Sequence, residues 1–176
     1  MNYLIVVGTV VGLIVGLIAL IVIIGMLLPV KHSATRSIVL PTSPARLWEL
    51  ISDFAAYDGW RTGVVEMQRQ PDANGHPVWK ELEKGGGGLA FETLAVEPQQ
   101  RIVRRIVGEG LPFGGTWTFV LKTVETGTEL TVTEDGEVYN PVFRFVSRFI
   151  MGHQRSMRIY FDDLTRKLAV QAVSFS

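Results

Sequence analysis

One histidine of this sequence lies where a helical pattern predicts an apolar surrounding. His153 falls between Phe149, Ile150 and Met157, at spacings that place all four side chains on one face of a helix. An imidazole inside an apolar pocket can orient a ligand through a hydrogen bond or act as a general acid or base. The alternative is a core histidine that bonds one backbone carbonyl.

A carboxylate lies at the end of an alternating strand pattern. Leu130, Val132 and Glu134 share one face of the strand, because side chains alternate with a period of two. An ionised carboxylate on an inner face is costly unless it is paired, so we expect Glu134 to have a partner or a raised pKa. In the alternative, the strand ends in water beside Asp135.

Two further charged residues belong to strands whose phase the sequence leaves open. Glu92 shares the inner face of its strand with Leu94 in one phase, whereas the other phase turns Phe91 inward and Glu92 outward. Arg104 is expected to share a face with its apolar neighbours and to pair with a carboxylate. The same ambiguity of phase affects Glu81.

Aromatic side chains predict an apolar wall. Trp117 and Phe119 alternate with threonines and are expected on the inner surface, as part of a ligand site or as ordinary core. Phe113 lies in the glycine-rich segment 108–115, which is longer than a tight hairpin requires. We expect this segment to gate a cavity mouth or to tuck into the end of the sheet.

The composition excludes several classes of protein. The 176 residues include 17 basic and 17 acidic side chains, which argues against a general nucleic-acid binder. The chain has no cysteine, so disulfides, cysteine-ligated metals and thiol nucleophiles are excluded. Its three histidines lack the spacing of metal ligands, and no dinucleotide or P-loop motif is present. We predict neither a metal site nor a cofactor.

Residues 1–30 carry no charged side chain. A helix over this segment would be roughly 40 Å long, compared with about 30 Å for the hydrocarbon core of a bilayer. A secretory signal peptide has a basic start, a shorter apolar stretch and a small-residue cleavage site, which this segment lacks. The sequence therefore predicts a retained single-pass transmembrane anchor over 1–30 and a membrane localisation.

Two features of the anchor bear on its surroundings. Lys31, His32 and Arg36 follow it and no basic side chain precedes it, which favours a cytoplasmic C-terminal domain. Two overlapping G-x-x-x-G units lie within it, formed by Gly8, Gly12 and Gly16. They predict a face for self-association, or they reflect the frequency of glycine in membrane helices.

The rest of the chain predicts an α+β domain. A linker over 31–35 leads into a domain over 36–170, and a tail over 171–176 follows. Ser43 and Asn140 each precede a proline, which is typical of a helix start. Short β-rich runs separated by turns fill the sequence between 63 and 138, and helical spacing continues from 142 to 170. We expect a curved antiparallel sheet of about seven strands wrapped around one long C-terminal helix.

This order of elements resembles the SRPBCC superfamily, which has the START-like helix-grip fold. The segment 43–54, followed by Tyr57 and Trp60, is similar to the opening of the bacterial polyketide cyclase/dehydrase and lipid-transport group. The segments 114–118 and 127–136 look like the last two strands of that group. The resemblance covers residues 36 to about 168. It implies the helix-grip fold and a superfamily of binders, transfer proteins and a few enzymes, with no universal catalytic set.

The sequence therefore predicts a membrane-anchored binding or carrier protein for a lipid-like or polycyclic molecule. No recognisable nucleophile–base pair is present, which favours binding over catalysis. The alternatives are a cyclase or dehydratase that uses His153 and a carboxylate, and a ligand-free interaction module at the membrane. The candidate ligand-binding residues are His153, Glu134, Glu92, Trp117, Phe119, Phe149, Met157 and Phe113.

Overall fold

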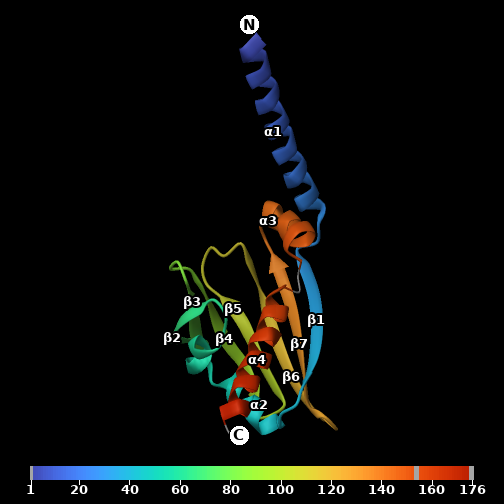
Figure 1. Cartoon of the computed structure of the whole chain (residues 1–176). Helices are drawn as coiled ribbons and strands as arrows, with labels where there is room; N and C mark the ends of the chain where they lie inside the picture. The colour runs from blue at the N-terminus through green and yellow to red at the C-terminus, as the bar shows by residue number, and fades with distance from the viewer. Residues whose placement is uncertain (1, 153–154, 175–176) are drawn as a thin grey trace.

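One antiparallel sheet and the C-terminal helix form the body of the protein in a computed structural model, which describes residues 2–152 and 155–174 (Figure 1). The sheet has seven strands in the order β1-β7-β6-β5-β4-β3-β2. Along the chain the elements are α1 (Asn2–Leu27), β1 (Lys31–Leu40), α2 (Pro44–Ser52), the 3-10 helix η1 (Phe54–Gly59), β2 (Val64–Ala73), β3 (His76–Glu83), β4 (Gly88–Glu97), β5 (Arg101–Val107), β6 (Phe113–Val124), β7 (Gly127–Val138), α3 (Pro141–Val146), the π-helical turn η2 (Ser147–Met151) and α4 (Arg155–Ser174).

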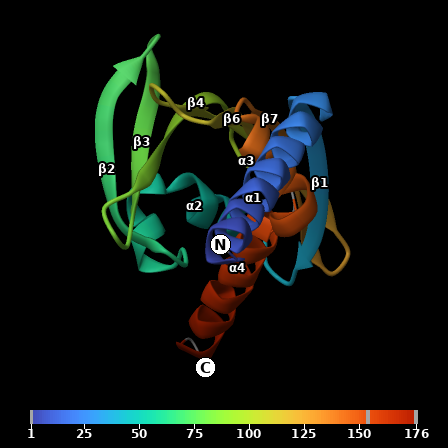
Figure 2. The same ribbon diagram turned by 90° about the horizontal axis from the view of Figure 1, so that it is seen from above.

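The sheet curves from β1 on one side to β2 on the other, and α4 lies in the hollow between them (Figure 2). Apolar side chains fill the space where the two meet. Leu130 and Val132 of β7 and Met157 and Leu164 of α4 are fully buried in one cluster, together with residues of α2. This arrangement covers the apolar face of a lone sheet. It confirms the helix-grip α+β fold predicted from the sequence.

Both predicted helix starts are present. The Ser43 hydroxyl accepts a hydrogen bond from the Arg46 amide (3.3 Å) at the start of α2. The Asn140 side chain accepts one from the Phe143 amide (3.0 Å) at the start of α3. Each cap satisfies an N–H group that has no partner within its helix, and the proline that follows needs none.

The predicted linker over 31–35 is wrong, because these residues form the first half of β1. Strand β1 pairs with β7 over its whole length, from Lys31 opposite Glu137 to Leu40 opposite Thr128. Its polar side chains reflect its place at the edge of the sheet, and this polarity resembled that of a linker. The predicted tail also begins too early, because α4 continues to Ser174.

The single helix predicted over 142–170 is interrupted. Gly152 has a φ of 73°, a left-handed conformation that glycine adopts without steric cost, and the chain changes direction between α3 and α4. Apolar residues on the two sides of this break continued one helical period, so the pattern did not reveal it. As a result, Phe149 and Ile150 are 60% and 71% exposed, whereas Met157 is fully buried.

Helix α1 rises from the end of the domain formed by α3 (Figure 1). A Cβ added at Gly25 would overlap the carbonyl oxygen of Pro141, so only glycine allows the two helices to approach this closely. The Arg144 guanidinium donates a hydrogen bond to the Leu28 carbonyl (2.9 Å). Among the described residues, Ile5–Leu27 is the one helix with the length and composition of a membrane span, and signal sequences share these properties.

The face of α1 formed by Gly8, Gly12 and Gly16 contacts nothing else in the described chain. Open space surrounds the position of a Cβ at each of these glycines. Self-association through this face stays a prediction.

The contact between Gly25 and Pro141 leads to the first testable prediction. Gly25→Ala should separate α1 from α3 and increase the rate of tryptic cleavage after Arg144 several-fold, because the added methyl group has no space. Gly16→Ala is the matched control, since it gives the same gain in helix propensity with nothing within 4 Å. Equal cleavage rates for the two variants in nanodiscs would contradict the packing described above.

Candidate ligand-binding site

A cavity of about 420 Å³ lies between the inner face of the sheet and the segment that contains α3 and the start of α4. Its volume is in the range of small-molecule sites. Most of the lining surface is apolar, and five of its eight large apolar side chains are aromatic. These eight side chains are Leu89, Phe91, Ile106, Phe113, Trp117, Phe119, Val138 and Phe143.

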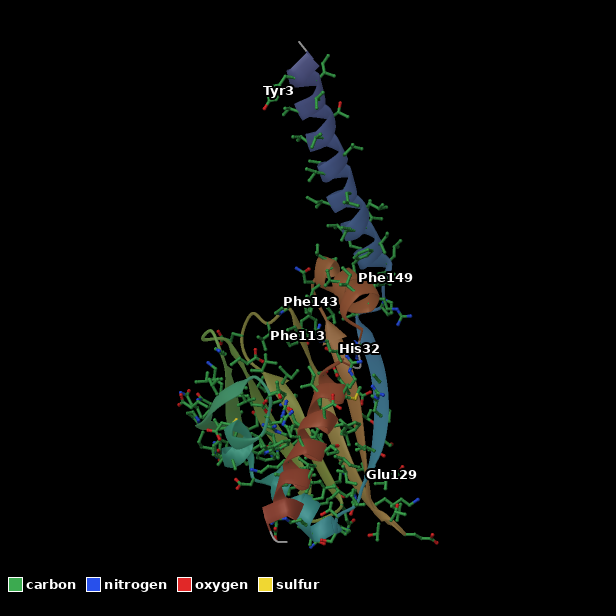
Figure 3. All side chains as sticks on the ribbon, in the orientation of Figure 1. Tyr3, His32, Phe113, Glu129, Phe143 and Phe149 are labelled. Atoms are coloured by element: carbon green, nitrogen blue, oxygen red, sulfur yellow. The ribbon has the colours of Figure 1, made fainter. Side chains whose placement is uncertain are left out.

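Two stacked aromatic rings lie at the end of the cavity nearest α1. Phe113 of β6 and Phe143 of α3 have ring centroids 5.6 Å apart, and both lie at the α1 end of the domain (Figure 3). Phe113 is paired with Val138, whose amide donates a hydrogen bond to the Val30 carbonyl (2.8 Å). This end of the cavity, which we call its mouth, is therefore built from the segments that adjoin α1.

Trp117 and Phe119 lie on the inner face of β6 and line the cavity. Both rings also contact Tyr160 of α4, at centroid distances of 6.4 Å and 5.4 Å. Phe119 is buried and Trp117 is half-buried, so the wall of the cavity continues directly into the core. Burial raises the pKa of Tyr160 well above its ordinary value, which keeps its phenol neutral.

Glu134 points inward from β7 and belongs to a small polar group. Its Oε1 atom lies 3.7 Å from His32 Nε2, and its Oε2 atom accepts a hydrogen bond from the Ser156 hydroxyl (3.3 Å). Burial raises the pKa of the Glu134 carboxyl, and the Ser156 bond offsets this in part. The His32 ring lies against Gly136, where a Cβ would overlap it. Sequence reasoning missed His32 because it fell in the supposed linker.

A buried ion cluster lies on the opposite wall of the cavity. Glu81 of β3 accepts a hydrogen bond from Arg104 Nη1 (3.0 Å), and its other oxygen lies 3.6 Å from Arg61 Nη1. The Arg104 side chain is 3% exposed and lies over the rings of Phe54 and Phe91, at 4.3 Å and 4.6 Å. Aromatic faces stabilise a desolvated guanidinium through their quadrupoles. The structure thus pairs Arg104 with Glu81, whose phase the sequence had left open.

Asp163 of α4 supports this cluster from the core. The amide and hydroxyl groups of Thr62 both donate to its carboxylate (2.7 Å and 2.5 Å), and Arg166 donates as well. Arg61 Nε lies 3.9 Å away, which is too far for a strong hydrogen bond. No sequence pattern pointed to Arg61 or Asp163, because Arg61 follows a 3-10 helix and Asp163 follows another acidic residue.

Three of the predicted site residues that the structure describes do not line the cavity. Glu92 is buried on the other face of the sheet, where Arg105 Nε and Nη2 donate to its Oε2 atom (3.1 Å and 2.5 Å). Met157 is core, and Phe149 is exposed beside the base of α1 (Figure 3). His153 lies outside the described residues.

The cavity therefore combines an aromatic channel with two different polar walls. One wall carries guanidinium groups, and the other carries a carboxyl with a raised pKa beside an imidazole. Within residues 2–152 and 155–174, no group of three acidic or histidine side chains is arranged to hold a metal ion. Such a lining suits an apolar molecule with a few polar atoms.

Solved structures share this fold at low sequence identity. The Zhui aromatase/cyclase from Streptomyces sp. R1128 aligns with a TM-score of 0.61 and 10% identity, over 78% of this chain and 93% of the other. A START superfamily protein from Mycobacterium smegmatis gives 0.60 and 17%, over 80% and 99%. Norcoclaurine synthase from Thalictrum flavum gives 0.62 and 11%, over 80% and 87%. No curated protein matches the chain in sequence.

The family comparison agrees with the fold and the cavity. The family model described as polyketide cyclase / dehydrase and lipid transport matches residues 31–169, which begin at the first residue of β1 and end within α4. The match includes every strand of the sheet and the residues that line the cavity. The chain therefore belongs to the polyketide cyclase / dehydrase and lipid transport family.

Proposed function

We propose that the protein binds and carries a hydrophobic small molecule in the cavity between the sheet and α4. The observation that carries this proposal is the aromatic channel of about 420 Å³, which the core does not fill. Small-molecule sites are largely apolar, concave pockets of about 300–1,000 Å³, so an aromatic pocket of this size beside the packed core points to a ligand. If a ligand buried about 200 Å² of apolar surface there, the hydrophobic contribution to its binding free energy would be about 5 kcal/mol.

The position of the mouth supports a role at the membrane. In the proposed carrier, α1 is a retained anchor, and α3 packs against its C-terminal end. Phe149 and Ile150 expose large apolar side chains at this same end of the domain. A membrane leaflet there would cover them and would lie next to the mouth formed by Phe113 and Phe143. The ligand would then exchange with the bilayer over a short distance.

Native mass spectrometry of the full chain, extracted gently from its source membranes, tests the binding proposal. The wild type should carry a stoichiometric small molecule. Ile106→Trp should reduce occupancy at least tenfold, because Ile106 lines the cavity and the indole would fill it. Val120→Trp, at an exposed position of β6 outside the cavity lining, should retain the ligand. A wild type without ligand that also takes up no added hydrophobic molecule would favour the interaction module.

The orientation of the domain is tested separately. A fluorescent reporter that matures only in the cytoplasm, fused after Ser176, should be active, because the basic residues that follow α1 favour the cytoplasmic side. The intact mass of the same fusion should include residues 1–30 if the segment is an anchor. Activity of a reporter specific for the opposite compartment, or loss of these residues, would overturn this part of the proposal.

A second candidate function is proton-transfer catalysis of the cyclase or dehydratase kind. The observation that favours it is the Glu134–His32 pair, in which a carboxyl with a raised pKa lies 3.7 Å from an imidazole inside the cavity. Such a pair can donate and accept protons. Incubation with the extracted ligand separates the two functions. A carrier returns the molecule unchanged, whereas an enzyme converts it and Glu134→Gln abolishes the conversion.

The raised pKa of Glu134 predicts a pH-dependent stability. Folding favours the neutral carboxyl, so its contribution is fully present below the ordinary value near 4.5 and is lost as pH rises through the folded-state pKa. Glu134→Gln stays neutral, so the unfolding free energy of this variant minus that of the wild type should grow from pH 4 to pH 8. Denaturant unfolding followed by tryptophan fluorescence measures this difference.

Ser156→Ala provides a second readout for the same carboxyl. This variant lacks a hydrogen bond that lowers the Glu134 pKa. In it, the stabilising contribution of the neutral Glu134 carboxyl should therefore be lost at a higher pH than in the wild type. A difference between Glu134→Gln and wild type that stays constant with pH would show that Glu134 titrates alike in the folded and unfolded states.

A further inference from the structure

Arg104, a residue of the cavity lining, has one hydrogen-bonding edge without a partner in the described chain. Its Nη1 atom donates to Glu81, but its Nε and Nη2 atoms have no hydrogen-bond partner among the residues that the structure describes. The side chain is 3% exposed and lines the cavity. Buried donors without partners are costly and rare in folded proteins. We infer that the ligand of the proposed carrier has a carboxylate, and that Arg104 binds this group through Nε and Nη2.

The geometry of the unfilled edge explains the choice of a carboxylate. Nε–H and Nη2–H point in parallel from one side of the planar guanidinium and match the two oxygens of a carboxylate. The neighbouring Arg105 uses this same pair of atoms to bind Glu92 on the other face of the sheet. Arg104 and Arg105 are adjacent in β5. The chain supplies a carboxylate to this edge of Arg105, whereas the equivalent edge of Arg104, a residue of the cavity lining, has no partner among the described residues.

The charges around Arg104 favour an anion. Arg61, Arg104 and Glu81 line this wall of the cavity, so two guanidinium groups share one carboxylate. Asp163 does not line the cavity, but it lies 3.9 Å from Arg61 Nε and pairs with Arg166 as well. Three guanidinium groups therefore share the carboxylates of Glu81 and Asp163, and a ligand carboxylate would balance the cluster at three positive and three negative charges. Buried charges are tolerated when they are paired in this way.

The other acidic groups of the lining lie away from Arg104. Glu134 is two strands across the sheet, because Arg104 is paired with Trp117 and Trp117 with Glu134. Glu83 and Glu137 are near the ends of their strands, and Glu137 lies 3.4 Å from Lys31 Nζ. Glu81 is therefore the one carboxylate of the described lining that contacts this guanidinium, and the rings of Phe91 and Trp117 lie beside it.

The length of the cavity indicates the rest of the ligand. On β6, Trp117 opposite Arg104 is four residues from Phe113 at the mouth, a distance of about 13 Å along a strand. The side chains of β4, β5 and β6 that line this stretch are aromatic or aliphatic, and the Glu134–His32 pair lies on its β7 side. The ligand is therefore an amphipathic monocarboxylic acid, with its acid group at Arg104 and its apolar body directed toward the mouth beside α1.

Two fluorescent probes that differ only in the head group test this inference. Pyrenebutyric acid carries a carboxylate at pH 7.5, and pyrenebutanol carries a hydroxyl on the same apolar body. Binding to the full chain in phosphatidylcholine nanodiscs is followed by energy transfer from tryptophan, with empty nanodiscs as the background. Arg104→Gln should weaken binding of the acid by roughly 10- to 100-fold and change binding of the alcohol less than threefold. Arg105→Gln is the matched control and should leave both affinities unchanged.

The outcomes separate this inference from the proposed function. Binding of both probes with equal effects of Arg104→Gln would overturn the carboxylate assignment and leave the carrier intact. Failure of the wild type to bind either probe would count against the carrier itself. If Arg104→Gln does not fold because Glu81 loses a partner, the double variant Arg104→Gln/Glu81→Gln removes both charges and should show the same selective loss of the acid.

Discussion

The sharing of Glu81 between Arg61 and Arg104 is the interaction on which the cavity depends. It joins β3, β5 and the segment after η1, and it places three charged groups where the apolar residues of the sheet and α4 would otherwise meet. A guanidinium cannot pack against aliphatic side chains without leaving its donors unsatisfied. The walls are therefore kept apart, and the aromatic channel remains beside a core that is otherwise filled.

Groups packed around the cluster offset the free energy that is needed to remove its charges from water. Aromatic rings lie over both arginines, with Tyr160 at 4.7 Å from Arg61 and Phe54 at 4.3 Å from Arg104. Asp163 anchors the segment that carries Arg61 by accepting two hydrogen bonds from Thr62, and it comes from α4 in the core. Removing one member of a buried pair typically costs about 3–5 kcal/mol. The stability of the core and the chemistry of the cavity are thus linked through α4.

The sequence predicted those features that depend on local patterns. The helix starts at Ser43 and Asn140 follow from capping, and the sheet follows from alternation and turns, so both agree with the structure. The break at Gly152 could not be read, because apolar residues on its two sides continue one helical period. The ion cluster of Glu81, Arg61 and Arg104 could not be predicted from the sequence either. Strand phase decides whether Glu81 and Glu92 face the cavity, and Arg61 lies outside any periodic element.

The mouth of the cavity and the first helix are mechanically connected. Phe143, which stacks on Phe113, belongs to α3, and α3 is fixed to α1 by the Gly25–Pro141 approach and by the Arg144 bond to Leu28. Strand β1 continues from α1 with only 28–30 between them, and it carries His32 into the cavity wall opposite Arg104. A change in the tilt of α1 would therefore move both sides of the mouth. In the proposed carrier, the bilayer that holds α1 also sets how readily Phe143 parts from Phe113, so that opening is coupled to the membrane from which an amphipathic acid would enter.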